Sequence, residues 1–283
     1  MRNVPATSSN RYFGVLSSED RIGQLYLECF NEREKCMTVI GGGKMATALA
    51  QGYPTSYSND EFYGILLIAI KPQMFPNFLD EMHLNEWLYF GGPELLAVSI
   101  MAGIGLGTFK QQLESAGFNG HAARLMPNVN CLVSAGIVLV STDPNIPSEM
   151  ATLLLELGSR VGHSVRIEES LFNAASALAS CAPAYIFAVI EALADGGVLN
   201  GLSREVSVRL AAEMVKGSAQ LVLNSPPEIT SPAQLKDKVC SPGGTTIAGM
   251  RELERAGIRS AFIEALTAST RRASEMSPTT KRQ

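Results

Sequence analysis

Short apolar runs alternate with helical segments over the first 167 residues, and this alternation restricts the fold more than any other feature. The clearest run, 64–70, is typical of a strand buried on both faces. Further strands are predicted at 37–40, 95–100, 122–126, 136–141 and 162–167, and helices at 44–51 and 149–160. Strands that alternate with helices predict an α/β fold with a mostly parallel, doubly wound sheet.

From Glu168 onward the pattern becomes helical. Ser203 precedes an amphipathic run, and Ser231-Pro232-Ala233-Gln234 is a capping box with proline at the first helical position. Two further helices are predicted at 246–256 and 260–275. We therefore expect an extension of unknown role at 1–36, an α/β domain at 37–167, an all-helical domain at 168–276 and a loose tail at 277–283.

Composition and charge exclude several classes of protein. Apolar residues make up 46% of the chain, enough for a buried core, and the net charge of −4 provides no bulk attraction to nucleic acid or anionic lipid. The five cysteines are odd in number, far apart and without a C-x-x-C, which indicates reduced thiols. The histidines are isolated, so we expect no metal site.

Two segments bear on membranes and targeting. Residues 170–190 carry no charge and are long enough for a membrane span, but they contain serines, Asn173 and Pro183. A helix buried in a core or a subunit interface is the favoured interpretation. Residues 1–18 contain Arg2, Arg11 and serines but no acid, a composition with some likeness to a transit peptide. They contain no apolar core, so we predict no secretory signal.

A glycine-rich turn, Gly41-x-Gly43-x-x-Ala46, follows the first strand and opens a helix. The first glycine permits a tight turn, the second lets the backbone approach a pyrophosphate, and the small Ala46 allows close packing. The alternative is an ordinary glycine turn. Asp60 and Glu61 lie where an acid for the ribose is expected, but a surface loop is the favoured interpretation. Too few residues separate Gly43 from the strand at 64 for a full β-α-β-α-β succession, so the adenine half is abbreviated.

A second turn, Ser241-Pro242-Gly243-Gly244-Thr245-Thr246, lies between two predicted helices. Two glycines free the backbone, and two hydroxyls stand where the next helix begins. N–H and O–H donors then surround one point, which suits a carboxylate. The alternative is a capped interhelical turn.

Together these segments resemble the pyrroline-5-carboxylate reductase family, over roughly residues 37–276. The matching stretches are 39–46, 69–73, 98–104, 124–128, 191–198 and the signature at 241–246. In the C-terminal half, residues 232–235 and 239–240 are similar to animal cytosolic-type members. The resemblance implies a Rossmann-like domain followed by a helical domain through which chains dimerise and assemble into larger rings.

The resemblance also implies the activity: hydride transfer from NADPH, or NADH, to the C=N bond of L-1-pyrroline-5-carboxylate, which gives L-proline in the last step of its synthesis. It implies that Thr246 is the catalytic donor and that Glu169, Gly244, Thr245 and Thr246 bind the substrate. The positions that match cofactor contacts are Ile40, Gly41, Gly42, Gly43, Lys44, Met45, Asn59, Ala69, Ile70, Lys71, Pro72, Ile100, Met101, Ala102 and Lys238. From the residues alone, Lys71 is equally a solvated lysine and Glu169 a helix-terminus acid.

The chain departs from the family pattern in three places. Residues 179–183 read Ala-Ser-Cys-Ala-Pro instead of Ser-Gly-Ser-Gly-Pro, Lys238 replaces a small polar residue, and the segment after Gly52 is abbreviated. One alternative is therefore a non-catalytic or weakly active partner subunit. Another is a hydroxyacid dehydrogenase, which needs a lysine that 196–201 does not offer. We expect the chain in the cytoplasm, with mitochondria as the alternative.

Overall fold

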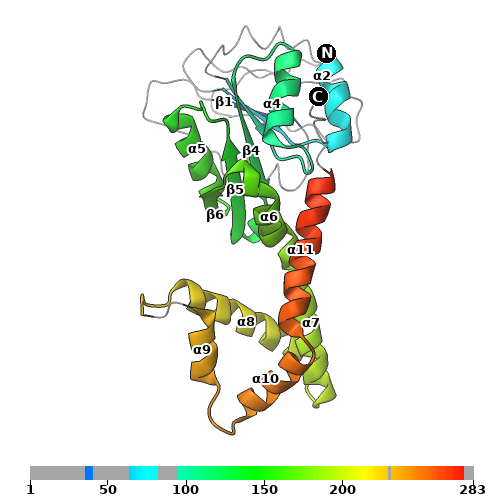
Figure 1. Cartoon of the computed structure of the whole chain (residues 1–283), viewed down its shortest axis with the longest axis vertical. Helices are drawn as coiled ribbons and strands as arrows, with labels where there is room; N and C mark the ends of the chain where they lie inside the picture. Colours follow the sequence, from blue (N-terminus) through cyan, green and yellow to red (C-terminus); the bar gives the residue numbers. More distant parts are fainter. Residues whose placement is uncertain (1–35, 41–63, 82–94, 229–230, 277–283) are drawn as a thin grey trace, which may run out of the picture. The chain divides into compact units, whose positions relative to one another are not determined.

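The computed structural model describes residues 36–40, 64–81, 95–228 and 231–276, and it divides the chain into two compact units (Figure 1). The first unit runs to Ser180 and takes in the chain again from Thr270, whereas the second is Cys181–Ser269. The domain boundary that we place near residue 167 marks a change in sequence character, and it stays a prediction.

The first unit is built on a sheet whose described strands follow chain order. Neighbouring strands are parallel except for one antiparallel pair, β4 with β5. The mostly parallel sheet and all its predicted strands are confirmed, but the reversal of strand order typical of a doubly wound sheet is not found among the described strands. The strands are β1 (Cys36–Ile40), β2 (Gly64–Ile68), β3 (Leu95–Ser99), β4 (His121–Pro127), β5 (Gly136–Thr142) and β6 (Gly162–Arg166).

Helices cover both faces of this sheet. Alternate residues of β2 point to opposite faces, as a period of two requires: Leu66 and Ile68 pack with α2 (Phe75–Glu81) and α4 (Leu106–Ser115), and Ile65 and Leu67 pack with α5 (Ser148–Ser159). Figure 1 shows α5 on the side opposite α2 and α4. The predicted helix at 149–160 is thus confirmed. The other helical segments that the structure describes between β1 and Ser176 are η1 (Pro72–Met74), η3 (Val129–Val133), η4 (Glu169–Leu171) and α6 (Phe172–Ser176).

A π-helical segment, η5 (Ala177–Cys181), spans the division between the units, and α-helices follow it. The Ser203 hydroxyl accepts a hydrogen bond from the Val206 N–H at 3.3 Å, and the Ser231 N–H donates to the Gln234 side chain at 3.3 Å. Both predicted helix starts are confirmed. The helices are α7 (Ala182–Leu199), α8 (Arg204–Leu223), α9 (Pro232–Val239), α10 (Thr245–Arg255) and α11 (Ile258–Met276).

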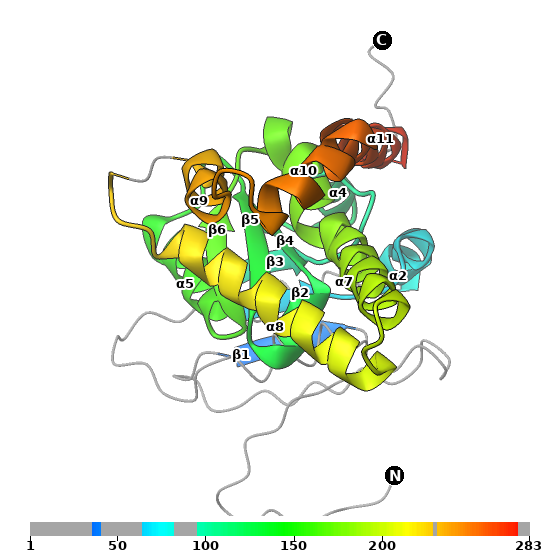
Figure 2. The same cartoon turned by 90° about the horizontal axis from the view of Figure 1, so that it is seen from below.

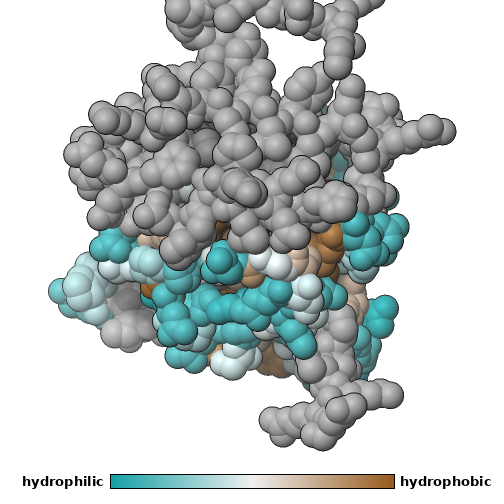
Figure 3. Space-filling view, turned by 90° about the horizontal axis from the view of Figure 1, so that it is seen from above, coloured by the Kyte–Doolittle hydropathy of each residue, from teal (hydrophilic) through white to brown (hydrophobic). Residues whose placement is uncertain are grey.

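The second unit has little hydrophobic core of its own. Helices α7 and α8 pack together and meet near their connecting turn (Figure 2). Among the described residues of this unit, however, the buried apolar side chains are those of Ala194 and Ala211. Large apolar side chains are exposed along its helices, including Phe187 and Leu210, both 57% exposed. The described surface seen from above is in contrast mostly hydrophilic (Figure 3).

One helical run, Glu169–Leu199, is long and apolar enough to cross a membrane by length and composition alone. Only 17% of its most apolar window is buried within the chain, so the core-helix interpretation of 170–190 is wrong for the single chain. The subunit-interface interpretation stays a prediction, and large exposed apolar surfaces mark interaction sites.

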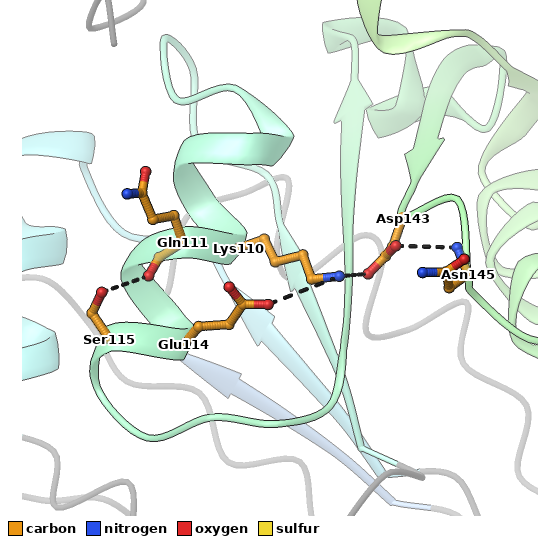
Figure 4. Close-up of polar contacts among 6 residues, drawn as sticks. All are labelled: Lys110, Gln111, Glu114, Ser115, Asp143 and Asn145. Atoms are coloured by element: carbon orange, nitrogen blue, oxygen red, sulfur yellow. Dashed lines mark hydrogen bonds and ion pairs between the residues drawn. The ribbon is translucent and has the colours of Figure 1, made fainter. Parts of the chain in front are cut away.

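A partly buried ion pair joins α4 to the turn after β5 (Figure 4). Asp143 is 2% exposed, accepts a hydrogen bond from the Lys110 ammonium, and caps the turn by accepting from the Asn145 N–H at 3.1 Å. Burial acts to raise the pKa of Asp143, but these hydrogen bonds and the positive charges of Lys110 and His121 outweigh it, so the pKa lies below its ordinary value.

We expect Asp143→Asn to lower the free energy of unfolding by about 1.5–3 kcal/mol at pH 7, the scale of a lost hydrogen bond to a charged group. Because the folded pKa is depressed, the stabilisation is present above the unfolded pKa of about 3.9 and is lost as the pH falls through the folded value. Urea unfolding of parent and variant at pH 7 and pH 3 measures this. An equal difference between parent and variant at both pH values would contradict the prediction.

Candidate functional site

The carboxyl ends of three neighbouring strands meet at one edge of the sheet. Ile40 at the end of β1 pairs with Ile68 of β2, which pairs with Ser99 of β3. The Ile100 N–H donates to the Ile68 carbonyl at 3.0 Å, so the segments that leave β2 and β3 stay side by side. In open α/β sheets this is the edge at which ligands bind.

Most of the described cofactor positions follow these strand ends. Ala69, Ile70 and the exposed Lys71 leave β2, and Pro72 starts η1. After β3, Ile100 is half-buried, Met101 is 2% exposed and Ala102 is exposed. Small and apolar side chains with one cation at the carboxyl edge fit a dinucleotide, whose rings need apolar contacts and whose phosphates need positive charge.

The other cofactor positions fall elsewhere. Ile40 is the last residue of β1. Gly41, Gly42, Gly43, Lys44, Met45 and Asn59, with the predicted helix at 44–51 and the abbreviated segment, lie outside the described residues. Lys238 is an exposed residue in the last turn of α9, in the second unit. The role of Lys238 toward a cofactor stays a prediction.

Glu169 is the first residue of η4, and its side chain lies at the N-terminus of α4, next to the loop that leaves β3. Its Oε1 accepts hydrogen bonds from the Leu106 N–H at 2.8 Å and from Arg124 Nη1 at 2.9 Å. Arg124 is 4% exposed, and its guanidinium carbon lies 3.9 Å from the centre of the Phe172 ring. Glu169 therefore meets a helix N-terminus, though that of α4 rather than its own. Its contact with a substrate stays a prediction.

The second turn opens a helix, as predicted. Gly243 has φ +65°, a left-handed conformation that favours glycine, and Gly244 is the N-cap of α10. A Cβ on Gly244 would displace the Ser241 hydroxyl and would lie 3.2 Å from the Ser241 carbonyl oxygen, so a side chain at this position is tight. Thr245 and Thr246 are the first two residues of α10, where N–H groups lack helical partners. The turn thus brings Gly244, Thr245 and Thr246 together at a helix N-terminus, and their contact with a substrate stays a prediction.

Two buried residues were not assigned a role from sequence. One is Arg124. The other is Asn128, 3% exposed, whose Nδ2 donates to the Ala179 carbonyl at 2.9 Å and whose Oδ1 accepts from the Ile137 N–H at 3.1 Å. Asn128 thereby holds η5, where the chain departs from the Ser-Gly-Ser-Gly-Pro pattern. The available signal was a polar residue directly after an apolar strand. Within the described ranges, no group of three His, Cys, Asp or Glu residues could hold a metal.

Comparison with known proteins gives consistent matches. A family profile described as pyrroline-5-carboxylate reductase dimerisation matches residues 169–276. A pyrroline-5-carboxylate reductase of Synechocystis is 40% identical over 75% of this chain and 74% of its own length. Pyrroline-5-carboxylate reductase 2 of Bos taurus is 37% identical over 75% of this chain and 64% of its own. The crystal structure of Plasmodium falciparum pyrroline carboxylate reductase with NADP bound is 28% identical, with a TM-score of 0.71, over 86% of this chain and 98% of that one.

Proposed function

The chain belongs to the pyrroline-5-carboxylate reductase family, and from this premise we propose that it reduces L-1-pyrroline-5-carboxylate to L-proline with NADPH or NADH, the last step of proline biosynthesis. The observation that carries the proposal within the chain is the turn at 241–246, which sets two threonines at the N-terminus of α10. The first unit supplies the sheet edge for the cofactor, and the second supplies the anion site for the substrate.

The reaction adds a hydride to the imine carbon and a proton to the nitrogen. Bound NAD(P)H supplies the hydride. The N–H groups at the start of α10 hold the substrate carboxylate, because they lack helical partners and the helix dipole favours negative charge. The Thr246 hydroxyl donates a hydrogen bond to the ring nitrogen of the neutral imine, and solvent supplies the proton that this nitrogen gains. An imine is readily protonated, so positioning contributes most of the rate enhancement.

Cofactor binding falls to the first unit. Ala69, Ile70, Ile100 and Ala102 offer apolar surface at the ends of β2 and β3, and Lys71 offers a positive charge there. The glycine turn at 41–46 follows β1, which ends at the same edge. These residues hold the cofactor and exclude water from one side of it.

The decisive experiment is NADPH oxidation by the purified chain with pyrroline-5-carboxylate, followed by the loss of the absorbance of the reduced nicotinamide. Proline must appear in equal amount. If the folded chain oxidises neither NADPH nor NADH in the presence of pyrroline-5-carboxylate, the proposed enzyme activity is wrong. The outcome would then favour the non-catalytic partner subunit.

Two copies of the chain form a homodimer through the helical residues matched by the dimerisation profile. The support is the exposed apolar surface of α7 and α8, on a unit whose described core is small. An obligate dimer interface is apolar in this way. We further propose that dimers assemble into a larger ring, and multi-angle light scattering of the purified chain gives the number of copies.

Phe187→Glu is expected to weaken the dimer at least about tenfold, because a carboxylate without a partner would be buried at the interface. Phe187 lies on α7 and is 57% exposed in the single chain. Sedimentation across a dilution series measures the dissociation constant. The matched control is Lys216→Gln on α8, a polar side chain that is 64% exposed. A dimer unchanged by Phe187→Glu would contradict this placement of the interface.

We propose two finer assignments. The likeness of residues 232–235 and 239–240 to animal cytosolic-type members favours that subgroup and a cytoplasmic location. Fractionation of cells that express the tagged chain tests the location. Recovery in the mitochondrial matrix with a shortened N-terminus would overturn it.

A further inference from the structure

The loop between β3 and α4, residues 100–105, carries three of the cofactor positions and is held by contacts on several sides. The Met101 N–H donates to the Ser99 Oγ at 3.1 Å. At the other end, the Leu106 N–H donates to the Glu169 Oε1 at 2.8 Å. Between them Gly103 has φ +79°, and a Cβ there would lie 3.5 Å from the Met276 carbonyl oxygen. The loop is thus fixed at both ends and packed in the middle.

The carboxylate at the end of this loop is itself fixed by a buried cation. Arg124 on β4 has a side chain only 5% exposed, whereas that of Glu169 is 36% exposed. One face of the guanidinium lies on the Phe172 ring, and Nη1 donates to the Glu169 Oε1 at 2.9 Å. A buried guanidinium needs an opposite charge, so Glu169 has one strongly preferred position. That position is the one from which Oε1 also reaches the Leu106 N–H.

We infer that Glu169 and Arg124 are positioning residues for the nicotinamide cofactor. Arg124 fixes Glu169, and Glu169 fixes the N-terminus of α4 and with it the loop that carries Ile100, Met101 and Ala102. The inference rests on the proposed function, because NAD(P)H must bind at this edge of the sheet. This inference gives Glu169 a role in cofactor binding, whereas the family resemblance implies that Glu169 binds the substrate.

The two roles of Glu169 predict different effects: a role toward the cofactor changes the Kd for NADPH, and a role toward the substrate changes the KM for pyrroline-5-carboxylate. Glu169→Ala is expected to raise the Kd for NADPH about tenfold, the scale of one lost hydrogen bond to a charged group. The KM for pyrroline-5-carboxylate at saturating NADPH is expected to change less than about twofold. NADPH binding is measured without substrate, by fluorescence titration of the full-length chain. The matched control is Glu168→Ala, since Glu168 is the exposed neighbour and makes no side-chain hydrogen bond among the described residues.

A rescue series separates positioning from a general loss of structure. Glu169→Gln keeps an oxygen for the Leu106 N–H, so its Kd is expected nearer to that of the parent than to that of Glu169→Ala. Arg124→Lys keeps the charge but loses the planar stacking on Phe172. Its Kd for NADPH is expected between that of the parent and that of Glu169→Ala. Hydrogen exchange gives a readout without cofactor: the Leu106 amide is expected to exchange faster in Glu169→Ala and at the parent rate in Glu168→Ala.

The outcomes are distinguishable from failure of the proposed function. If the parent binds NADPH but does not reduce pyrroline-5-carboxylate, the function is wrong, and the Kd series still decides the inference. A raised KM for the substrate with an unchanged Kd for NADPH in Glu169→Ala would overturn the inference in favour of a substrate contact. Unchanged values of both, or a parent chain that binds no NADPH, would overturn it as well.

Discussion

Phe172→Ala is expected to lower the free energy of unfolding by about 3–5 kcal/mol, the range for truncating a buried aromatic residue. Phe172 of α6 is 0% exposed and packs in one cluster with Leu139 of β5 and Ala179 of η5. Its ring also lies 3.9 Å from the Arg124 guanidinium carbon. The substitution leaves a cavity and removes the surface on which a buried cation rests, so both packing and cation–π terms are lost.

Urea unfolding at one fixed protein concentration measures the effect, because dimerisation makes apparent stability depend on concentration. Glu168→Ala is the matched control: this exposed, polar side chain makes no side-chain hydrogen bond among the described residues, and its loss is expected to change stability by less than about 0.5 kcal/mol. Phe172→Leu should lose less stability than Phe172→Ala, since it keeps much of the volume. Equal losses for Glu168→Ala and Phe172→Ala would show that the cluster is not a core.

Thr246→Ala is expected to lower kcat/KM for pyrroline-5-carboxylate by about one to two orders of magnitude. A lost hydrogen bond to a charged group is worth about 1.5–3 kcal/mol, and about 1.4 kcal/mol is tenfold in rate. Thr246 is half-buried at the second position of α10, behind the left-handed Gly243 and the N-cap Gly244. Steady-state NADPH oxidation measures the effect.

Cofactor affinity gives the control for this variant. Thr246 lies in the second unit, and the described cofactor positions at 69–72 and 100–102 lie in the first, so the Kd for NADPH should stay unchanged. Thr245→Ala is the matched neighbour and should cost less if Thr245 contributes mainly its backbone N–H. A parent-like rate for Thr246→Ala with a slow Thr245→Ala would assign the hydroxyl role to the wrong threonine. If both variants react as the parent does, the turn is only a helix cap.

The strands could be predicted from sequence because burial on both faces leaves a continuous apolar run, as in 64–68 and 95–99. The helices α2 and α4 were not assigned from sequence, although each shows helical spacing. In α4 the buried residues Leu106, Phe109 and Leu113 recur at i, i+3 and i+7 with Lys110 and two glutamines between them, which is the spacing of an amphipathic helix. Helix α2 follows Pro72, which reads as the end of an element rather than as the first residue of one.

In the candidate site, features that depend on neighbouring residues in the sequence could be predicted, whereas contacts between distant residues could not. The turn at 241–246 could be predicted because glycine and threonine at a helix start act through their own backbone. The contacts of Glu169 could not, because its partners Leu106 and Arg124 are 63 and 45 residues away in the chain. A sequence pattern of helical or strand period carries no information on such pairs. Only the assembled sheet brings β4, α4 and η4 to one carboxylate.

The chain-order sheet has a consequence for how the protein is made. Each described strand pairs with the next one in sequence, so each pairing can form from β1 to β6 once the following strand has emerged from the ribosome. The packing of Met276 against Gly103 is different, because it joins the last described residue to the loop after β3. That contact can form only after the helical segments have been synthesised, so the loop between β3 and α4 acquires its final packing after the strands around it have paired.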